Sequence, residues 1–341
     1  MQRRSLIRAA LAGSAALGLP AVVRAQALEK PKIAIAVGGK NLLYYLPLSI
    51  AESLGYFKAE GLDVTISDFA GGSRALQAVV GGSADVVSGA FEHTLNMQVK
   101  GQRLRAFALQ GRAPQIVLGV NPKTMPNFKS VAELKGKKIG VTAPGSSTHV
   151  LLEYVLSQAG VARDSVAVIG VGAGASAVAA LRSGQVDGLS NLDPAIAMLE
   201  RAGELHVITD TRSVAESQRV FGGPMPGGCL YATQRFIDAQ PAATQALTSA
   251  LVRADAWIQR ASLDQILAAV PESYLLGDPD VYRAALTAGR PALSADGVIP
   301  EGAPETALRA LSLLDPALKD STLDLGACYT NEFVRHAAVS T

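Results

Sequence analysis

Glycines and hydroxyl residues gather before two predicted helices, where they could bind an anion. Gly71-Gly72-Ser73 and Gly145-Ser146-Ser147-Thr148 each lie between a predicted strand and a predicted helix. Glycines let a ligand approach the free backbone N–H groups of the first turn, and the helix dipole attracts negative charge there. The alternative for each hydroxyl is that it only caps its own helix. We predict ligand contacts from Gly72, Ser73, Ser146, Ser147 and Thr148.

Two further polar loops follow predicted strands. One reads Ser88-Gly89-Ala90-Phe91-Glu92-His93, and the other reads Ser190-Asn191-Leu192-Asp193-Pro194. If the two loops face each other across a cleft, both could contact a ligand. For Asp193, helix capping is an equal alternative, because a following proline is a standard helix start. The residues predicted to contact a ligand here are Gly89, Glu92, His93, Asn191 and Asp193.

Two adjacent tyrosines follow the first predicted strand. Tyr44 and Tyr45 could form an aromatic wall of the site, and packing in the core is the equal alternative. His149 lies one turn inside its predicted helix. We interpret it as a packed or surface histidine.

The motifs of common hydrolases and metal enzymes are missing. Gly71-Gly72-Ser73-Arg74-Ala75 lacks the second glycine of the G-x-S-x-G turn that exposes a nucleophilic serine. The chain has neither an H-E-x-x-H nor a C-x-x-C motif, and its four histidines are widely spaced. We therefore expect no catalytic residue, no cofactor and no metal, with an exported hydrolase as a minor alternative.

The order of predicted elements indicates an α/β fold. Short apolar runs alternate with helical stretches up to about Ile208, a pattern typical of mostly parallel sheets flanked by helices. After about Thr233, predicted helices dominate. Residues 72–88 resemble residues 174–190, with six identities at an offset of 102. This repeat predicts two similar lobes with a ligand cleft between them.

The first 25 residues have the features of a secretory signal peptide. Three arginines precede an apolar run over 9–23, and small residues allow cleavage near Ala25 or Ala27. The Arg3-Arg4 pair fits either twin-arginine or general export. No later segment reaches the ~18 uninterrupted apolar residues needed to span a bilayer. These features predict a soluble exported protein.

Composition narrows the possible partners. The chain has 341 residues, of which 49% are hydrophobic and 18% are charged, and its formal net charge is +2. So small a charge argues against nucleic acid as a partner. Two cysteines are too few for a disulfide scaffold or a four-cysteine metal site. In an oxidising compartment Cys229 and Cys328 could form a disulfide, and two buried thiols are the equal alternative.

Several motifs, in their order along the chain, resemble one family. They are Gly71–Ala78, Gly82–Val86, Gly136–Val141, Gly145–His149 and Asp193–Ala195. Their order is similar to that of the substrate-binding proteins of ABC importers for nitrate, taurine and alkanesulfonates, which are type II periplasmic binding proteins. The resemblance covers roughly residues 30–260.

The resemblance implies a fold, a partner and a compartment. The fold has two α/β lobes joined by two crossover segments, the first built from 28–118 and 224–341 and the second from 119–223. A periplasmic monomer of this kind closes on a small anion, such as a sulfonate, nitrate or an organic carboxylate, and delivers it to ABC permease subunits in the inner membrane. Related binders of the thiamine pyrimidine precursor carry a cysteine-rich motif that this chain lacks. A binding module like those of the thiamine pyrimidine precursor and a sensor module are the two further alternatives.

Overall fold

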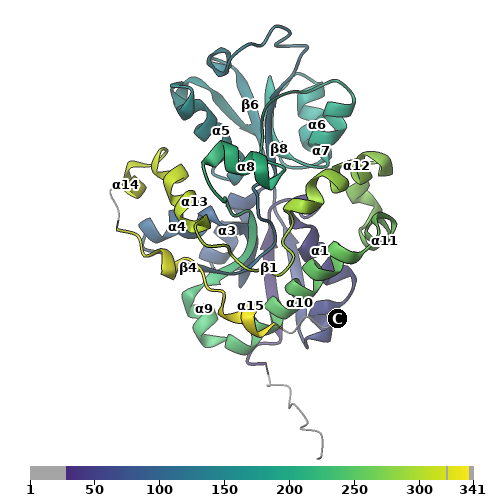
Figure 1. Cartoon of the computed structure of the whole chain (residues 1–341), viewed down its shortest axis with the longest axis vertical. Coiled ribbons are helices and arrows are strands. Elements are labelled where there is room, and N and C mark those ends of the chain that lie inside the picture. Colours follow the sequence, from purple (N-terminus) through teal and green to yellow (C-terminus); the bar gives the residue numbers. More distant parts are fainter. Residues whose placement is uncertain (1–27, 320–321, 338–341) are drawn as a thin grey trace, which may run out of the picture.

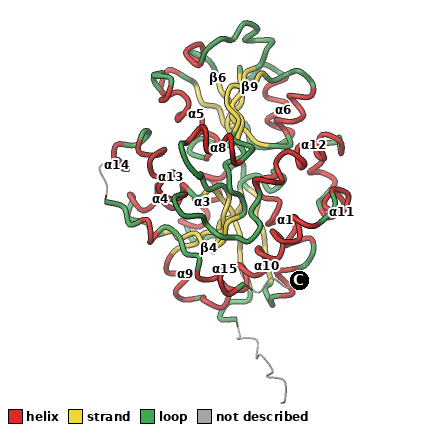
Figure 2. Tube along the Cα trace, viewed as in Figure 1, coloured by secondary structure: helices red, strands yellow, loops and turns green. Residues whose placement is uncertain are grey.

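The computed structural model describes residues 28–319 and 322–337. The predicted signal peptide, with its cleavage near Ala25 or Ala27, lies outside the described residues. Two five-stranded sheets stand one above the other, each covered by helices (Figure 1; Figure 2). Each sheet with its covering helices forms one lobe. Within the described residues, no helix is both long and apolar enough to cross a membrane.

The sheet of the first lobe has the strand order β2-β1-β3-β10-β4. β1 pairs in parallel with β2 and β3, whereas β10 runs antiparallel to β3 and β4. All five residues of β3 are buried, as expected for a strand with helices on both faces of its sheet. The strands are β1 Lys32–Val37, β2 Asp63–Asp68, β3 Val86–Ala90, β4 Leu104–Leu109 and β10 Gly228–Thr233.

The sheet of the second lobe repeats this arrangement as β7-β6-β8-β5-β9. β6 pairs in parallel with β7 and β8, and β5 runs antiparallel to β8 and β9. In both sheets the one antiparallel strand occupies the fourth position. The strands are β5 Ile116–Val120, β6 Lys138–Val141, β7 Ala167–Gly170, β8 Gly188–Leu192 and β9 His206–Asp210.

Helices connect the parallel strands in the same order in both lobes. The repeat between 72–88 and 174–190 falls on α3–β3 and α6–β8, and both β3 and β8 are third in their sheets. The sequence repeat thus corresponds to equivalent structural units. The helices are α1 Leu46–Ser53, α2 Tyr56–Ala59, α3 Gly72–Val80, α4 Glu92–Val99, α5 Ser147–Gln158, α6 Ala175–Arg182, α7 Ala195–Arg201 and α8 Val214–Phe221.

The carboxyl third is helical, as predicted. The 20-residue helix α10 begins with Pro241 at its first position and packs along α1. Other helices of this layer reach the second lobe, where α12 contacts α7 and α13 contacts α5 (Figure 1). The helices are α9 Gln234–Ala239, α10 Pro241–Arg260, α11 Leu263–Ala269, α12 Pro279–Gly289, α13 Ala303–Ser312, α14 Pro316–Lys319 and α15 Glu332–His336. Short 3-10 helices are η1 Leu43–Tyr45, η2 Val131–Leu134, η3 Arg163–Ser165, η4 Glu272–Leu275, η5 Arg290–Ala292 and η6 Leu325–Ala327.

The chain passes between the sheets twice, and the two crossings lie side by side. The first leads from β4 to β5 and the second from α8 to β10. The N–H of Gly227 donates to the carbonyl of Gly111 over 2.8 Å. A Cβ on Gly227 would lie 2.2 Å from the carbonyl oxygen of Ala113, so this close approach needs glycine. Because β5 belongs to the second sheet, residues 116–118 lie in that sheet, ahead of the boundary expected at 118.

Candidate functional site

The two predicted anion-binding helix starts meet where the lobes touch. The backbone N–H of Ser73, in the first turn of α3, donates to Ser146 Oγ over 3.0 Å. Ser146 Oγ in turn donates to Ser73 Oγ over 3.3 Å, and Ser73 Oγ donates to the carbonyl of Pro144 over 2.9 Å. The start of one helix is therefore bonded to a side chain at the start of the other, across the two lobes.

Gly72 lies at the centre of this junction. A Cβ built on Gly72 would lie 3.3 Å from His93 Cε1 and 3.9 Å from both Ser146 Oγ and the hydroxyl oxygen of Tyr45. Polar side chains from three elements thus converge on a residue that has no side chain. The neighbouring Gly71 permits the contact between lobes, because its Cβ would lie 2.7 Å from Cβ of Ala143.

His93 is a buried, neutral member of the site. Its Nδ1 lies 2.8 Å from the hydroxyl of Tyr231, and burial lowers its pKa to about 4. Its Nε2 is buried and has no hydrogen-bond partner among the described residues. Gly89 allows the bond to Tyr231, since a Cβ there would lie 3.0 Å from the tyrosine hydroxyl. Gly89 therefore supports the site from within the sheet.

Glu92 places a carboxyl group among tyrosines at the start of α4. Its side chain is buried, and this burial raises its pKa to about 7. It forms no ion pair with any lysine, arginine or histidine in the described part of the chain. Burial, with the charge of Glu92 as a smaller contribution, raises the pKa of Tyr44 and Tyr45. Near neutral pH the Glu92 carboxyl can therefore act as a hydrogen-bond donor or acceptor.

Thr148 and Asn191 have partners within their own lobe. Thr148 Oγ1 accepts from the N–H of Thr142 over 3.0 Å and lies 2.9 Å from Thr142 Oγ1. Asn191 Nδ2 donates to the carbonyl of Gly172 over 3.1 Å, and its Oδ1 accepts from the N–H of Leu192. These two side chains fix loops next to the junction. Ser147, the first residue of α5, is half-buried.

Asp193 acts mainly as a helix cap in the structure. Its Oδ1 accepts from the N–H of Ala197 over 2.9 Å, and Arg212 Nη1 lies 3.7 Å from its Oδ2. Burial raises the Asp193 pKa to about 6, and Arg212 opposes that shift. The carbonyl of Asp193 accepts from the N–H of Leu43 over 3.1 Å, which joins the lobes at a second place, away from Ser73.

The polar loops 88–93 and 190–194 each contact a different part of the chain. His93 lies against Gly72, whereas Asp193 bonds to Leu43. Tyr44 and Tyr45 are both buried, and their rings form an edge-to-face pair with centroids 4.8 Å apart. Tyr45 packs in the core, and its hydroxyl lies near Gly72 at the junction. Its contact with a ligand stays a prediction.

The two cysteines are free buried thiols, so the possible disulfide between Cys229 and Cys328 is absent. Cys229 lies in β10 opposite Gly89 and Leu109, inside the sheet. Cys328 follows η6 and accepts a hydrogen bond from Gln98 Nε2 over 3.5 Å. Burial raises the pKa of both thiols.

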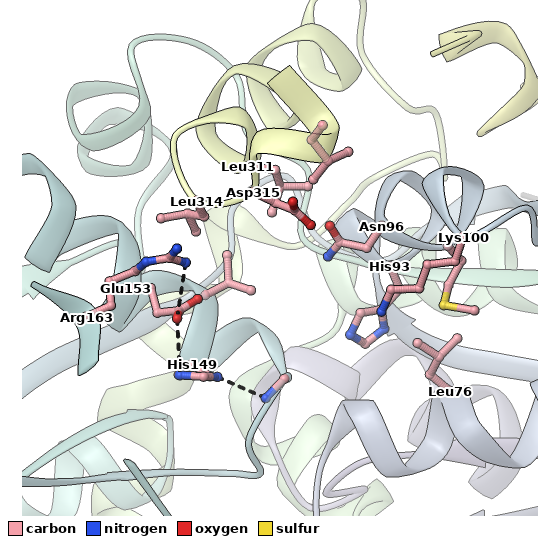
Figure 3. Close-up of a pocket in the computed structure, with 14 residues that line it drawn as sticks. Leu76, His93, Asn96, Lys100, His149, Glu153, Arg163, Leu311, Leu314 and Asp315 are labelled. Atoms are coloured by element: carbon pink, nitrogen blue, oxygen red, sulfur yellow. Dashed lines mark hydrogen bonds and ion pairs between the residues drawn. The ribbon is translucent and has the colours of Figure 1, made fainter. Parts of the chain in front are cut away.

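A cleft lies between the lobes beside this junction, as the sequence repeat predicted, but its lining by α13 and α14 was not predicted. This interlobe cleft has a volume of about 340 Å³ and lies between α4 and α5, with α13 and α14 along its third side (Figure 3). Its lining includes Leu76, His93, His149, Val150, Leu311 and Leu314. The periodicity of α13 predicts a helix with a buried face but does not reveal which neighbour that face covers.

His149 helps to shape the inner edge of the interlobe cleft. Its Nδ1 accepts from the N–H of Gly145 over 3.0 Å, which holds the loop before α5 (Figure 3). Glu153 Oε1 lies 3.7 Å from His149 Nε2 and 3.4 Å from Arg163 Nη1. Burial lowers the His149 pKa, while Glu153 acts in the opposite direction.

Comparison with known proteins places this geometry in a family. A model of the NMT1-like family matches residues 26–270. The chain belongs to the NMT1-like family. The match includes both helix starts and both crossings, and it ends at α11, before the helices α13 and α14 that line the interlobe cleft.

Solved structures share the fold of this NMT1-like chain. A protein from Bordetella bronchiseptica RB50 is 60% identical, with a TM-score of 0.90 over 92% of this chain and 98% of that one. The alkanesulfonate-binding protein SsuA from Xanthomonas axonopodis pv. citri, bound to MOPS, is 20% identical, with a TM-score of 0.69 over 89% and 99%. The periplasmic nitrate-binding protein NrtA from Synechocystis PCC 6803 is 15% identical, with a TM-score of 0.71 over 92% and 89%. The chain thus has the periplasmic binding protein fold. Enzymes also occur among the matched proteins, so the fold alone does not decide between binding and catalysis.

Proposed function

We propose that this NMT1-like protein is the solute-binding component of an ABC importer and captures a small anion between its lobes. The observation that carries the proposal is the contact of Ser73 in α3 with Ser146 beside α5, 73 residues apart and on different lobes. Two helix starts aimed at one point provide N–H groups, hydroxyls and positive dipole ends for an anion. Sulfonates, nitrate and organic carboxylates all suit such donors.

The mechanism follows from the two crossings. We place the hinge at the paired segments around Gly111 and Gly227, and the interlobe bonds of Ser73 and Asp193 break when the lobes part. An anion bound at the start of one of the two helices, α3 or α5, then draws the start of the other helix toward it. Permease subunits recognise the closed form. The protein acts as a periplasmic monomer. Its export is tested by osmotic shock, which should release a mature chain that begins near Gln26 or Leu28.

Binding without catalysis is favoured by the surroundings of Ser73. Its hydroxyl bonds to the Pro144 carbonyl and to Ser146, and no histidine nitrogen bonds to it among the described residues. A nucleophilic serine needs a base within hydrogen-bond reach. The nearby His93 bonds to Tyr231 through Nδ1, and its Nε2 makes no hydrogen bond to Ser73 among the described residues.

The test combines thermal shift with product analysis on nitrate, taurine, methanesulfonate, octanesulfonate and octanoate. An anion at 100 times its Kd should stabilise the fold by ~2.7 kcal/mol and be recovered unchanged. Stabilisation by none of these anions would contradict anion capture. Turnover that is lost in Ser73→Ala would instead establish an enzyme.

A further inference from the structure

A second, much smaller cavity lies where the first crossing meets both lobes. The helix η1 of the first lobe lines it, together with Asp193 and Arg212 of the second lobe, Gln115 of the first crossing and Gly289 at the end of α12. Its volume is about 10 Å³, which is roughly the room that one water molecule needs. We call it the hinge cavity, because the crossing that lines it joins the lobes.

Gln115 is held in an unusual conformation beside the hinge cavity. Its φ of 56° lies in the left-handed region, which residues other than glycine rarely adopt. Its N–H donates to the carbonyl of Thr211 over 3.1 Å, and its side-chain Nε2 donates to the carbonyl of Gly289 over 3.2 Å. Its other side-chain atom, Oε1, is buried and has no hydrogen-bond partner within the residues that the structure describes. Buried polar atoms are almost always hydrogen-bonded, so we expect a donor for Oε1 from a bound molecule.

A pair of charged groups on the wall of the hinge cavity lies too far apart for a direct hydrogen bond. Asp193 Oδ2 and Arg212 Nη1 are 3.7 Å apart, although Nη1 also lies 2.6 Å from Glu200 Oε2. Polar groups at such a separation are often linked through a water molecule. One water can donate to Gln115 Oε1 and to Asp193 Oδ2 and accept from Arg212 Nη1, which gives it three bonds.

The charges around the hinge cavity favour a neutral molecule. The guanidinium of Arg212 repels a cation, and the carboxylate of Asp193 repels an anion. The volume excludes anything much larger than water. A neutral molecule of this size that both donates and accepts hydrogen bonds is water.

We infer that the hinge cavity binds one water molecule, which joins Gln115 to Asp193 and Arg212 when the lobes are in contact. Leu43 and Tyr44 line the cavity from the first lobe, and Asp193 and Arg212 line it from the second, so it is complete only in that closed state. The bond from the N–H of Leu43 to the carbonyl of Asp193 crosses between the lobes beside it. The water is therefore bound on closing, stabilises the closed state, and is released on opening.

Crystal structures at a resolution that shows ordered water test the inference, in a closed state recognised by the bond between Leu43 and Asp193. The wild type should hold one ordered water in the hinge cavity. Gln115→Met keeps the length of the side chain, removes both of its polar groups and should lose the water. Absence of the water from the wild type would overturn the inference, as would a water equally well ordered in Gln115→Met. A metal ion in its place, recognised by contacts shorter than about 2.6 Å, would also overturn it. The wild-type structure decides alone if Gln115→Met does not fold.

Affinity measures what the water contributes to closure, and this part rests on the proposed anion capture. Gln115→Met leaves the carbonyl of Gly289 and the water without a partner in the closed state, so the Kd for octanesulfonate should rise about 2- to 10-fold. Gln185→Met, the same change on the exposed surface of the second lobe, should leave the Kd unaltered. Equal Kd values for Gln115→Met and the wild type would overturn the role of the water in closure. Absence of binding by every anion would contradict anion capture, whereas the crystal structure decides on the water independently.

Discussion

At the scale of residues, hydroxyl groups next to each other in sequence have different roles. Ser146 bonds across the lobes, whereas Thr148 bonds back to Thr142 and is completely buried. Local sequence predicts both as donors at a helix start. It cannot predict which way each side chain points, because that depends on the rotation of α5 against the sheet.

Thr148→Ala should therefore lower stability more than affinity. Loss of the buried hydroxyl leaves the Thr142 N–H without its acceptor, and this should lower the free energy of unfolding by about 1–3 kcal/mol. Urea unfolding measures this change, and titration should give a Kd close to that of the wild type. Thr148→Ser, which keeps the hydroxyl, should restore most of the stability. Normal stability with weakened binding would show that Thr148 contacts the ligand.

Asp255 gives a prediction for the pH dependence of stability. It is completely buried in α10, and neither carboxyl oxygen has a partner among the described residues. Burial raises its pKa well above the ordinary value, with the charge of Asp296 adding to the shift. The folded state thus holds the proton more tightly than the unfolded state, so stability falls as the pH rises above the unfolded pKa of ~3.9.

Asp255→Asn removes this titration. The variant should exceed the wild type in free energy of unfolding at pH 8, and the difference should shrink toward pH 4. Urea unfolding of both proteins between pH 4 and pH 8 measures this difference in the free energy of unfolding. A difference that is constant with pH would mean that Asp255 does not carry the raised pKa.

At the scale of elements, alternation of strands and helices predicted most of the architecture. The repeat at 72–88 and 174–190 correctly indicated equivalent units, because each pairs a helix with the strand that follows it. The same reasoning wrongly implied that the two strand ends would face each other. The observed contacts instead join the start of α3 to the start of α5, and Leu43 to Asp193.

The crossings between the lobes depend on one close approach. Gly227→Ala places a methyl group 2.2 Å from the Ala113 carbonyl and should lower the free energy of unfolding by about 1–3 kcal/mol. Gly111→Ala in the partner crossing is the control, since its nearest neighbour would be 3.5 Å away. Thermal unfolding of both variants measures the difference. Equal free energies of unfolding for Gly227→Ala and Gly111→Ala would show that the close approach of Gly227 to Ala113 does not hold the two crossings together.

At the scale of the whole molecule, the carboxyl-terminal helices link both lobes. α13 contacts α4 in one lobe and α5 in the other, and α12 contacts α7. Sequence predicted these helices but not their position, because an amphipathic pattern does not identify the surface it covers. Hinge motion must accommodate these contacts, so opening changes the interlobe cleft together with the junction.

The proposed function requires that an anion is held between the two helix starts. The most direct measurement is a calorimetric titration of octanesulfonate and octanoate into the wild type, Ser146→Ala and Ser157→Ala, the last being the same change at the far end of α5. The wild type and Ser157→Ala should bind one anion per chain with equal Kd, and Ser146→Ala should bind about 10- to 150-fold more weakly, because a hydrogen bond to a charged group is lost. Equal affinity of Ser146→Ala and the wild type would contradict the claim.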